Sequence, residues 1–385
     1  MNPTTSYDYI ITGGGCAGLS LIMRMLKSDA LKNKRILLVE QDLKKTNDRT
    51  WCYWEKGEGA FEEIVFKKWD HAWFHADEYS SLKTLAPYQY KMIRGIDFYN
   101  HCHDAIKNES RVDLVNEKVL SLENDATGVL VTTDAGNYHG KYVFNSILFQ
   151  EPVKQPNRIY LLQHFKGWII ETDQPSFNPS QATLMDFRVD QTHGTTFVYV
   201  MPFSETKALV EYTLFTPSLL QDAEYEKALE KYVQNQLSIK DYTVLEKEFG
   251  VIPMSDHKFP EREGNIIYLG TAGGKTKPSS GYTYRFIQKH VEVLVSRLET
   301  QADPFIVNNP FEKRFLLYDR ILLNILNKRS LEGKHIFSLL FKRNKINQLF
   351  SFLDNETSII EELYLLNTLP QLPFIKSGVE LITVN

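Results

Sequence analysis

A strand, a glycine turn, a helix and a second strand follow one another at the start of this chain. The apolar strand Tyr9–Ile11 runs into Gly13-Gly14-Gly15-Cys16-Ala17-Gly18, which fits the pattern G-x-G-x-x-G. Leu19–Leu31 has the apolar spacing of a helix, and Arg35–Val39 is a second apolar strand that ends at Glu40. This order predicts a βαβ unit of the Rossmann type, and it is stronger evidence than the glycines alone.

Each part of this unit has a physical task in binding a dinucleotide. Gly13 permits the tight turn, Gly15 lets a pyrophosphate approach the bare backbone, and Gly18 lets the helix pack closely on the sheet. The N-terminus of the helix presents free N–H groups to an anion. Glu40 lies 22 positions after Gly18, where an acid accepts hydrogen bonds from both ribose hydroxyls. The unit predicts a bound dinucleotide; the alternative is a glycine turn in an unrelated α/β protein.

A second strand and glycine turn lie about 250 residues later. The apolar strand Ile266–Leu269 runs into Gly270-Thr271-Ala272-Gly273-Gly274, and a loop containing Gly281 leads into a predicted helix, Tyr284–Leu298. A strand that enters a helix through glycines is an anion-binding arrangement. This second turn suits the far end of a long cofactor such as FAD, and NAD would not need it. The alternative is a glycine-rich loop without a ligand.

Length and composition exclude several other classes of protein. The 385 residues allow two domains, and the formal charge of −4 implies no general affinity for nucleic acid. The three cysteines (Cys16, Cys52 and Cys102) form no C-x-x-C pair and no zinc spacing, so we expect neither a metal site nor disulfides. We expect no signal peptide and no membrane span, and hence a cytoplasmic protein.

The remaining periodicity predicts two groups of strands and a helical C-terminal region. Four short strands between 112 and 144 suggest a small antiparallel sheet that precedes a return strand, Tyr142–Asn145. Further strands between 158 and 216 suggest a second sheet that roofs the cofactor, and Tyr225–Gln236 reads as a helix. We therefore expect an α/β fold with a discontinuous FAD-binding domain (1–75, 95–150 and 250–300), an inserted antiparallel substrate domain (76–94 and 151–249) and a C-terminal helical region (301–385).

Two segments contain polar residues that could bind the cofactor or donate a proton. The segment 47–55 is rich in hydrogen-bond donors and aromatic residues, and as a loop near the dinucleotide it would let Arg49 meet a phosphate. The alternative is a solvated turn with packed tryptophans. The segment 197–213 reads as two strands joined by a short turn, with Glu211 among apolar neighbours. A poorly solvated carboxyl has a raised pKa and keeps a proton to donate. The alternative is an outward-facing glutamate on an alternating strand.

Residues 310–350 combine a positive charge with apolar helical faces. This segment contains nine Lys and Arg residues and three acidic residues, which gives a formal charge of about +6. Apolar faces with basic flanks suit peripheral contact with an anionic membrane, with Lys328, Arg329, Lys342 and Arg343 toward the lipid. They equally suit helices that pack on the rest of the protein and expose a solvated basic side.

Several motifs, in order along nearly the whole chain, resemble the flavoprotein lycopene cyclases of bacterial carotenoid synthesis. They are the glycine fingerprint followed by Asn47–Trp54, Leu184–Phe187, Tyr199–Phe203, Leu209–Glu211, Gly250–Met254, Gly270–Gly274 with Lys277–Tyr282, Phe352–Asp354, and Leu369–Phe374. Asn145-Ser146 departs from the family pattern, in which an acid, a small residue and an arginine are expected.

This resemblance implies a bilobed flavoprotein fold similar to that of p-hydroxybenzoate hydroxylase, with C-terminal helices. It also implies a redox-neutral reaction in which the ψ ends of lycopene or related carotenoids are cyclised to β-ionone rings. By analogy Glu211 would be the catalytic acid, reduced FAD would stabilise the cation, and NAD(P)H would serve only to reduce the flavin. Aromatic residues would shelter the cation. The candidates are Trp51, Tyr53, Trp54, Phe197 and Tyr199.

Two other functions fit the same fold. A flavin-dependent monooxygenase or reductase for an apolar isoprenoid shares the fold, although such enzymes commonly have Gly-Asp after the late strand and this chain has Gly270-Thr271. A flavin-binding scaffold without catalysis is the third reading, and Glu211 in an apolar strand argues against it. The sequence leaves the oligomeric state open.

Overall fold

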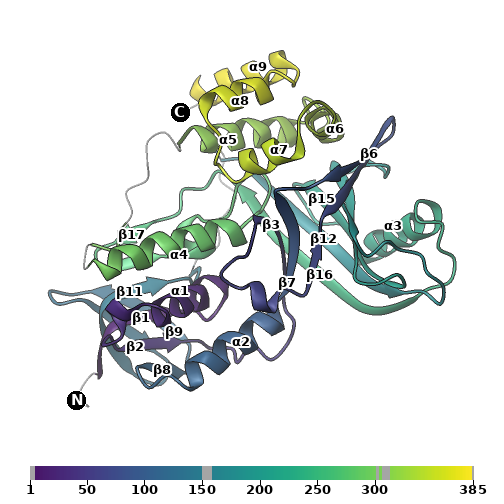
Figure 1. Cartoon of the computed structure of the whole chain (residues 1–385). Coiled ribbons are helices and arrows are strands. Elements are labelled where there is room, and N and C mark those ends of the chain that lie inside the picture. Colours follow the sequence, from purple (N-terminus) through teal and green to yellow (C-terminus); the bar gives the residue numbers. More distant parts are fainter. Residues whose placement is uncertain (1–4, 150–157, 301–302, 306–312, 384–385) are drawn as a thin grey trace.

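The computed structural model describes residues 5–149, 158–300, 303–305 and 313–383, and Figure 1 shows their arrangement. Two large sheets lie side by side, and the C-terminal helices cover their junction. The first sheet has eight strands: β1 (Thr5–Thr12), β2 (Ile36–Val39), β8 (Val112–Val115), β9 (Val119–Asn124), β10 (Val129–Thr133), β11 (Asn137–Asn145), β17 (Arg262–Glu263) and β18 (Ile266–Tyr268).

The centre of the eight-stranded sheet is parallel, as a βαβ fold requires. Strands β18, β11, β1, β2 and β8 pair in that order and in parallel, because helical crossovers return the chain to the same edge. The helices α1 (Cys16–Leu26), α2 (Gly95–Lys107) and α4 (Tyr284–Glu299) share a core with one face. The β9–β10 hairpin, which pairs with β11, shares a smaller core with the other face.

The second sheet has seven strands in the order β16-β12-β15-β14-β13-β5-β6. Its strands are β5 (His71–Ala76), β6 (Tyr79–Thr84), β12 (Tyr160–Glu171), β13 (Gln181–Asp186), β14 (Thr195–Pro202), β15 (Lys207–Thr216) and β16 (Thr243–Ser255). All neighbours are antiparallel except β13 and β5. Helix α3 (Asp222–Asn235) packs on one face, and the other face belongs to the largest core of the protein.

A three-stranded sheet and the C-terminal helices contribute to that largest core. The sheet pairs β3 (Thr50–Lys56), β7 (Tyr88–Arg94) and β4 (Lys67–Trp69). The helices are α5 (Lys313–Lys328), α6 (Gly333–Arg343), α7 (Ile346–Leu353), α8 (Ile359–Leu366) and α9 (Gln371–Thr383). Short 3₁₀ turns at Asp29–Leu31, Glu62–Ile64 and Gly270–Gly273 complete the elements. Within the described residues, no helix combines the length and the apolarity needed to cross a bilayer.

The main elements agree with the sequence predictions. The return strand is confirmed as the end of β11, which pairs in parallel with β1. The helices predicted at Tyr225–Gln236 and Tyr284–Leu298 are α3 and α4, with ends shifted by at most three residues. The predicted helical character of the C-terminal region is confirmed from Lys313 to Thr383; residues 301–302, 306–312 and 384–385 lie outside the described part of the chain.

Four local predictions were wrong. The segment 50–56 is a strand instead of a loop, because its aromatic side chains alternate between two cores. The first helix ends at Leu26 instead of Leu31, and a 3₁₀ turn follows Ser28, since serine favours a cap position over a helix interior. The small antiparallel sheet lacks β8, which pairs in parallel with β2. Of the strands predicted between 158 and 216, Ile159–Leu162 and Gly167–Glu171 were expected as two separate strands, but they form one strand, β12.

The domain limits stay a prediction. Near the limit predicted between residues 75 and 76, β5 and β6 join the seven-stranded sheet, whereas β7 pairs with β3 and β4. The limits at 150 and 301 fall on residues that the structure does not describe.

Candidate active site

The first glycine turn leaves its backbone bare on one side. Gly13 has φ +98°, and its N–H donates to the Val39 carbonyl (2.9 Å). A Cβ at Gly18 would lie 2.1 Å from the Gly13 carbonyl oxygen, so only glycine lets α1 start here. A Cβ at Gly15 would have no atom within 4 Å. This open space at the N-terminus of α1 is where a pyrophosphate could approach.

Glu40 lies against the same turn. Its carboxylate accepts hydrogen bonds from the backbone N–H groups of Gly14 and Asp42, so both oxygens are held at the end of β2. An acid at the carboxyl end of the second strand is suited to ribose hydroxyls. The structure thus brings Glu40 and the Gly13–Gly18 turn together.

Arg49 lies just before β3, with its side chain largely exposed beside Asp48. Its carbonyl accepts a hydrogen bond from Gly95 N (2.7 Å), which holds the segment to the start of α2. Burial raises the pKa of the Cys16 thiol to about 12, while the Arg49 guanidinium lowers it, so the guanidinium acts on the first residue of α1. Arg49 is therefore within electrostatic reach of the predicted phosphate position.

The second glycine turn touches the first. Gly270 has φ +55°, and a Cβ on it would lie 3.0 Å from the Ala17 Cβ in α1. Gly273 packs against the Tyr268 carbonyl, and Gly274 adopts the left-handed region with φ +69°. Gly281 lies elsewhere: a Cβ there would be 2.5 Å from Gln163 Oε1 of β12. Gly281 thus joins the α4 entry loop to the seven-stranded sheet, and its part in cofactor binding stays a prediction.

Glu211 is in the middle of β15, on the face that meets the largest core. Its register partners are Tyr199 in β14 and Gly167 in β12. The Thr213 hydroxyl donates to Glu211 Oε1 (2.9 Å). Burial, together with the negative charge of Glu248, raises the pKa of the Glu211 carboxyl well above its usual range. A carboxyl in this setting keeps its proton to a higher pH than a solvated glutamate does, and it is suited to act as a general acid.

Other titratable groups gather around Glu211 from three further elements. Burial raises the pKa of Tyr199 and of Cys52 well above their usual ranges, and the charge of Glu211 adds to each shift. Tyr199 and Tyr282 hydrogen-bond each other, and burial raises the pKa of Tyr282 to about 12. Tyr90 on β7 belongs to the same group. Each of these four side chains is neutral at pH 7, so Glu248 is the neighbour of Glu211 that can add a negative charge.

The five aromatic residues predicted for the substrate divide between two cores. Trp54, Phe197 and Tyr199 belong to the same core as Tyr282, and Trp54 contacts Tyr282 edge-on (4.8 Å between ring centroids). Trp51 and Tyr53 point to the opposite side of β3, where they pack with Tyr284 of α4. The structure brings three of the five to the Glu211 side and not the other two.

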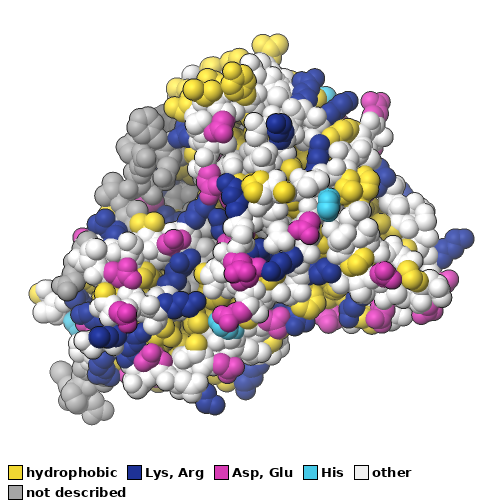
Figure 2. All heavy atoms as spheres, viewed as in Figure 1, with side chains coloured by type: hydrophobic (Ala, Val, Ile, Leu, Met, Phe, Trp, Pro, Cys, Tyr) yellow, Lys and Arg dark blue, Asp and Glu magenta, His cyan; other side chains and the backbone are white. Residues whose placement is uncertain are grey.

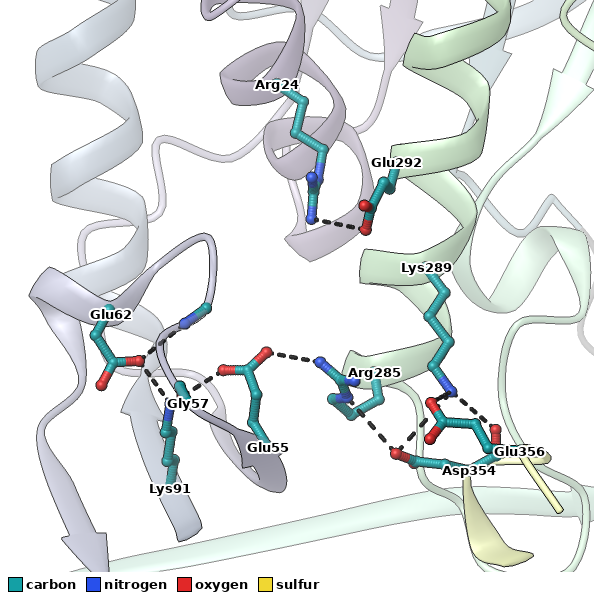
Figure 3. A network of polar contacts seen from close by, with 11 residues as sticks. Arg24, Glu55, Gly57, Glu62, Lys91, Arg285, Lys289, Glu292, Asp354 and Glu356 are labelled. Atoms are coloured by element: carbon teal, nitrogen blue, oxygen red, sulfur yellow. Dashed lines mark hydrogen bonds and ion pairs between the residues drawn. The ribbon is translucent and has the colours of Figure 1, made fainter. Parts of the chain in front are cut away.

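A buried ion network joins the three-stranded sheet to α4 and the C-terminal helices, as Figure 3 shows. Lys91, which has no exposed surface, contacts Glu62 (2.6 Å) and Glu55 (3.1 Å). Arg285 contacts the other oxygen of Glu55 (2.6 Å) and approaches Asp354 (3.7 Å). Burial raises the pKa of Asp354 to about 6, although the nearby cations lower it. These pairs fix β3, and with it Cys52 and Trp54, against α4.

Sequence reasoning missed Glu248, which the structure places beside Glu211. Only Gly250–Met254 was predicted as a strand or loop, whereas β16 runs from Thr243 to Ser255. The alternation of Glu248 with Gly250, Ile252 and Met254 was the available signal. At the position where the family pattern is broken, Asn145 is buried and accepts a hydrogen bond from Thr12 Oγ1 (2.7 Å). Among the described residues, no cluster of three or more His, Cys, Asp or Glu side chains is arranged to hold a metal ion.

Comparison with known proteins settles the family. A model of the lycopene cyclase protein family matches residues 8–378. The chain belongs to this family. Among its curated relatives, this lycopene cyclase family member is 26% identical over 298 residues to a chloroplastic neoxanthin synthase of Solanum tuberosum, covering 72% of this chain and 57% of that protein. It is 25% identical over 239 residues to a lycopene beta-cyclase of a Paracoccus species, covering 57% and 60% of the two chains.

The chain spans a little over half the length of these relatives. Solved structures with the same fold include a geranylgeranyl bacteriochlorophyll reductase-like protein of Thermoplasma acidophilum (TM-score 0.60, 12% identity, 99% of this chain and 100% of that one). A probable FAD-dependent monooxygenase of Pseudomonas aeruginosa is similar (TM-score 0.59, 13% identity, 85% and 98%). The predicted family and the bilobed flavoprotein fold are confirmed.

Proposed function

We propose that this protein is a lycopene β-cyclase, an isomerase that closes the ψ ends of lycopene to β-ionone rings through γ-carotene to β-carotene. The observation that carries the proposal is Glu211: a carboxyl in a sheet, facing the main core, with a pKa raised well above its usual range by burial and by Glu248. Redox-neutral cyclisation needs one well-placed proton donor, and the family membership of the chain agrees with that chemistry.

FAD is the proposed cofactor, since the residues of the two glycine turns fit it. The open space above Gly15 admits the pyrophosphate, Arg49 can meet a phosphate, and Glu40 can hold the ribose. Contact between Gly270 and Ala17 places the second turn beside the first, so one extended dinucleotide can lie along both. When bound in its reduced form, FAD supplies a negative charge that stabilises a neighbouring cation. NAD(P)H is proposed only as the reductant of the flavin.

The chain's own residues then perform the proton chemistry. Glu211 donates its proton to C2 of the terminal C1=C2 bond, which leaves a tertiary cation at C1. The C5=C6 bond attacks C1 and moves the cation to C5, and the proton on C6 leaves to restore a C5=C6 bond. One proton is gained and one is lost, so the product is an isomer of the substrate. General acid catalysis of this kind contributes roughly 10²–10⁴-fold to a rate.

Neutral aromatic groups around Glu211 protect the cation from water. Trp54, Tyr199 and Tyr282 lie on the Glu211 side of the core, and Tyr199 is the direct register partner of Glu211. An aromatic face that is shielded from solvent stabilises a cation by about 2 kcal/mol. Because burial keeps the phenols protonated, they do not compete with Glu211 as anions.

Peripheral attachment to a membrane completes the proposal, because lycopene is an apolar molecule that dissolves in bilayers. Three of the basic residues predicted to contact lipid bind within the protein: Lys328 pairs with Glu380, Arg329 donates to the carbonyls of 191 and 192, and Arg343 donates to the Thr368 carbonyl.

An exposed apolar surface lies instead on α8 and α9, at the top of Figure 2. It comprises Ile359, Ile360, Leu363, Tyr364, Leu372, Ile375, Val379 and Ile382. Apolar stripes of this kind insert into the headgroup region of a bilayer.

The proposal is tested by anaerobic incubation of the purified protein with lycopene in liposomes, with and without a reductant for FAD. We expect γ-carotene and β-carotene by chromatography, no stoichiometric consumption of NAD(P)H, and at least a 100-fold loss in Glu211→Gln with FAD binding retained. Full activity of Glu211→Gln would remove the acid from its role.

The same experiment separates the alternatives. Incorporation of oxygen when air is readmitted would indicate a monooxygenase, and a reduced product would indicate a reductase. Chromatography must also resolve ring types, because the relatives include a neoxanthin synthase and a capsanthin/capsorubin synthase.

A further inference from the structure

Two carboxyl groups flank one glycine on the inner face of the seven-stranded sheet. Gly167 in β12 is the register partner of Glu211 in β15 on one side and of Glu248 in β16 on the other. Register partners in neighbouring strands point to the same face, so these three positions form one row across the sheet. The two glutamates are two strands apart, a backbone separation of about 10 Å.

The missing side chain at Gly167 lets the two carboxyls meet. A Cβ built on Gly167 would lie 2.8 Å from both Cγ and Oε1 of Glu248, and 3.0 Å from Cδ1 of Leu209. The Glu248 side chain therefore occupies the space directly above Gly167. From there its carboxyl forms a hydrogen bond with the carboxyl of Glu211. A hydrogen bond between two carboxyl groups needs a proton on one of them.

The surroundings decide which carboxyl has the proton. Burial raises the pKa of both groups; the hydrogen bond then raises the pKa of Glu211 and lowers that of Glu248. The Thr213 hydroxyl, which donates to Glu211, lowers the pKa of Glu211 in turn. An arrangement with Glu211 as donor and Glu248 as ionised acceptor agrees with the direction in which each group shifts the other. The other titratable groups around the pair are Tyr199 on β14, Cys52 on β3, Tyr90 on β7, Tyr282 before α4, and Glu246 on β16.

We propose that Glu248 is a positioning residue that holds the reactive proton on Glu211, and that Gly167 makes this contact possible. The inference rests on the proposed role of Glu211 as the acid of the cyclisation. The pair contains one proton before the reaction and none while the carbocation exists. Its second negative charge is thus present only when the cation is present. The proton released from C6 returns to the pair, which restores its starting state, and no further donor or oxidant is needed.

The proton on Glu211 can be measured without turnover. Protonated carboxyl groups absorb in the infrared at a position separate from carboxylates, so the wild-type FAD-bound protein titrated with pH should show a band that is absent in Glu211→Gln. In Glu248→Gln this band should disappear at lower pH, because the neighbouring negative charge is gone. The alkaline limb of the activity profile should move in the same direction, with at least a tenfold loss at pH 8 and a smaller loss at pH 6.

A second variant and a control keep the test independent of folding. Gly167→Ala retains both acids but displaces the Glu248 side chain, so it should shift the band as Glu248→Gln does. Glu171→Gln, which changes an exposed acid at the end of β12, should leave the band close to its wild-type position. If the infrared band of Glu248→Gln disappears at the same pH as that of the wild type, the inference is overturned and the cyclase proposal remains intact. A shifted midpoint in a protein that makes no cyclic product would overturn the cyclase proposal and leave the shared proton standing.

Discussion

The rings of Trp54 and Phe350 stack with their centroids 4.4 Å apart and their planes 3° from parallel. Trp54 lies in β3 and Phe350 in α7, so this contact joins the central three-stranded sheet to the C-terminal helices. Both side chains are buried in the core that also holds Tyr199 and Leu209. The C-terminal helices are therefore part of the wall around the Glu211 side of the sheet, and their packing bears on the site.

Replacing Phe350 by alanine should destabilise the protein by about 3–5 kcal/mol, because a buried ring is lost and a cavity remains. Phe350 is 1% exposed. Thermal unfolding would measure the effect. Leu372→Ala is the matched control, since Leu372 is 81% exposed and its truncation should leave the melting temperature nearly unchanged. Equal losses in both variants would contradict the assigned packing.

Gly15→Ala should fold normally and bind FAD roughly tenfold more weakly, which corresponds to ~1.4 kcal/mol. The backbone of Gly15 has φ −85°, which alanine tolerates, and the added methyl group meets no protein atom within 4 Å. It would fill only the space assigned to the pyrophosphate. Fluorescence titration with FAD measures the change. Gly136→Ala, which is equally unobstructed but far from the turn, should bind as the wild type does.

Lys91→Met should destabilise the fold by about 3–5 kcal/mol, because the buried Glu55 and the partly exposed Glu62 would lose the cation that they share. Denaturant unfolding is the measurement. Lys68 also pairs with Glu62 but is 40% exposed, so Lys68→Met should cost less than about 1 kcal/mol. A small effect at Lys91 would mean that the network is solvated in solution.

The protein should lose stability as the pH falls from about 6.5 to 4, in part through His164. Its ring nitrogens are hydrogen-bonded to Thr216 (2.6 Å) and Tyr225 (2.5 Å), and burial lowers its pKa to about 4. In this pH range His164 therefore binds a proton in the unfolded chain but not in the native state. The loss amounts to about 3 kcal/mol when complete. Unfolding of His164→Gln measured against pH should show a shallower acid decline, whereas His193→Gln at the surface should follow the wild type.

Attachment to vesicles should depend on the apolar surface of α8 and α9 and should persist in high salt. Leu363→Glu combined with Ile375→Glu should release the protein from liposomes in a flotation assay, because both side chains are exposed and each charge opposes insertion. Charge reversal at Lys342 should have little effect. Release by salt alone would favour the basic segment 310–350 as the contact instead.

Local patterns predicted much of this protein, and the failures have physical reasons. The βαβ unit could be predicted because strand, glycines, helix and acid are all close together in sequence. Glu211 was identified through its apolar neighbours and the family motifs. Glu248 was not, because its place beside Glu211 arises from a register across β12 that no local pattern contains. Trp51 and Trp54 looked alike in sequence, but alternation along β3 sends them to different cores.

The contact between Gly270 and Ala17 has a consequence for the order in which the protein is made. The central parallel strands come from three distant stretches of the chain, and β18 with α4 is the last of them to leave the ribosome. A nascent chain shorter than about 300 residues therefore leaves the edge of β11 unpaired, and it has the first glycine turn outside the ribosome without the second. Under the proposed function, the flavin can therefore bind only after β18 and α4 have been synthesised and have paired with the first glycine turn.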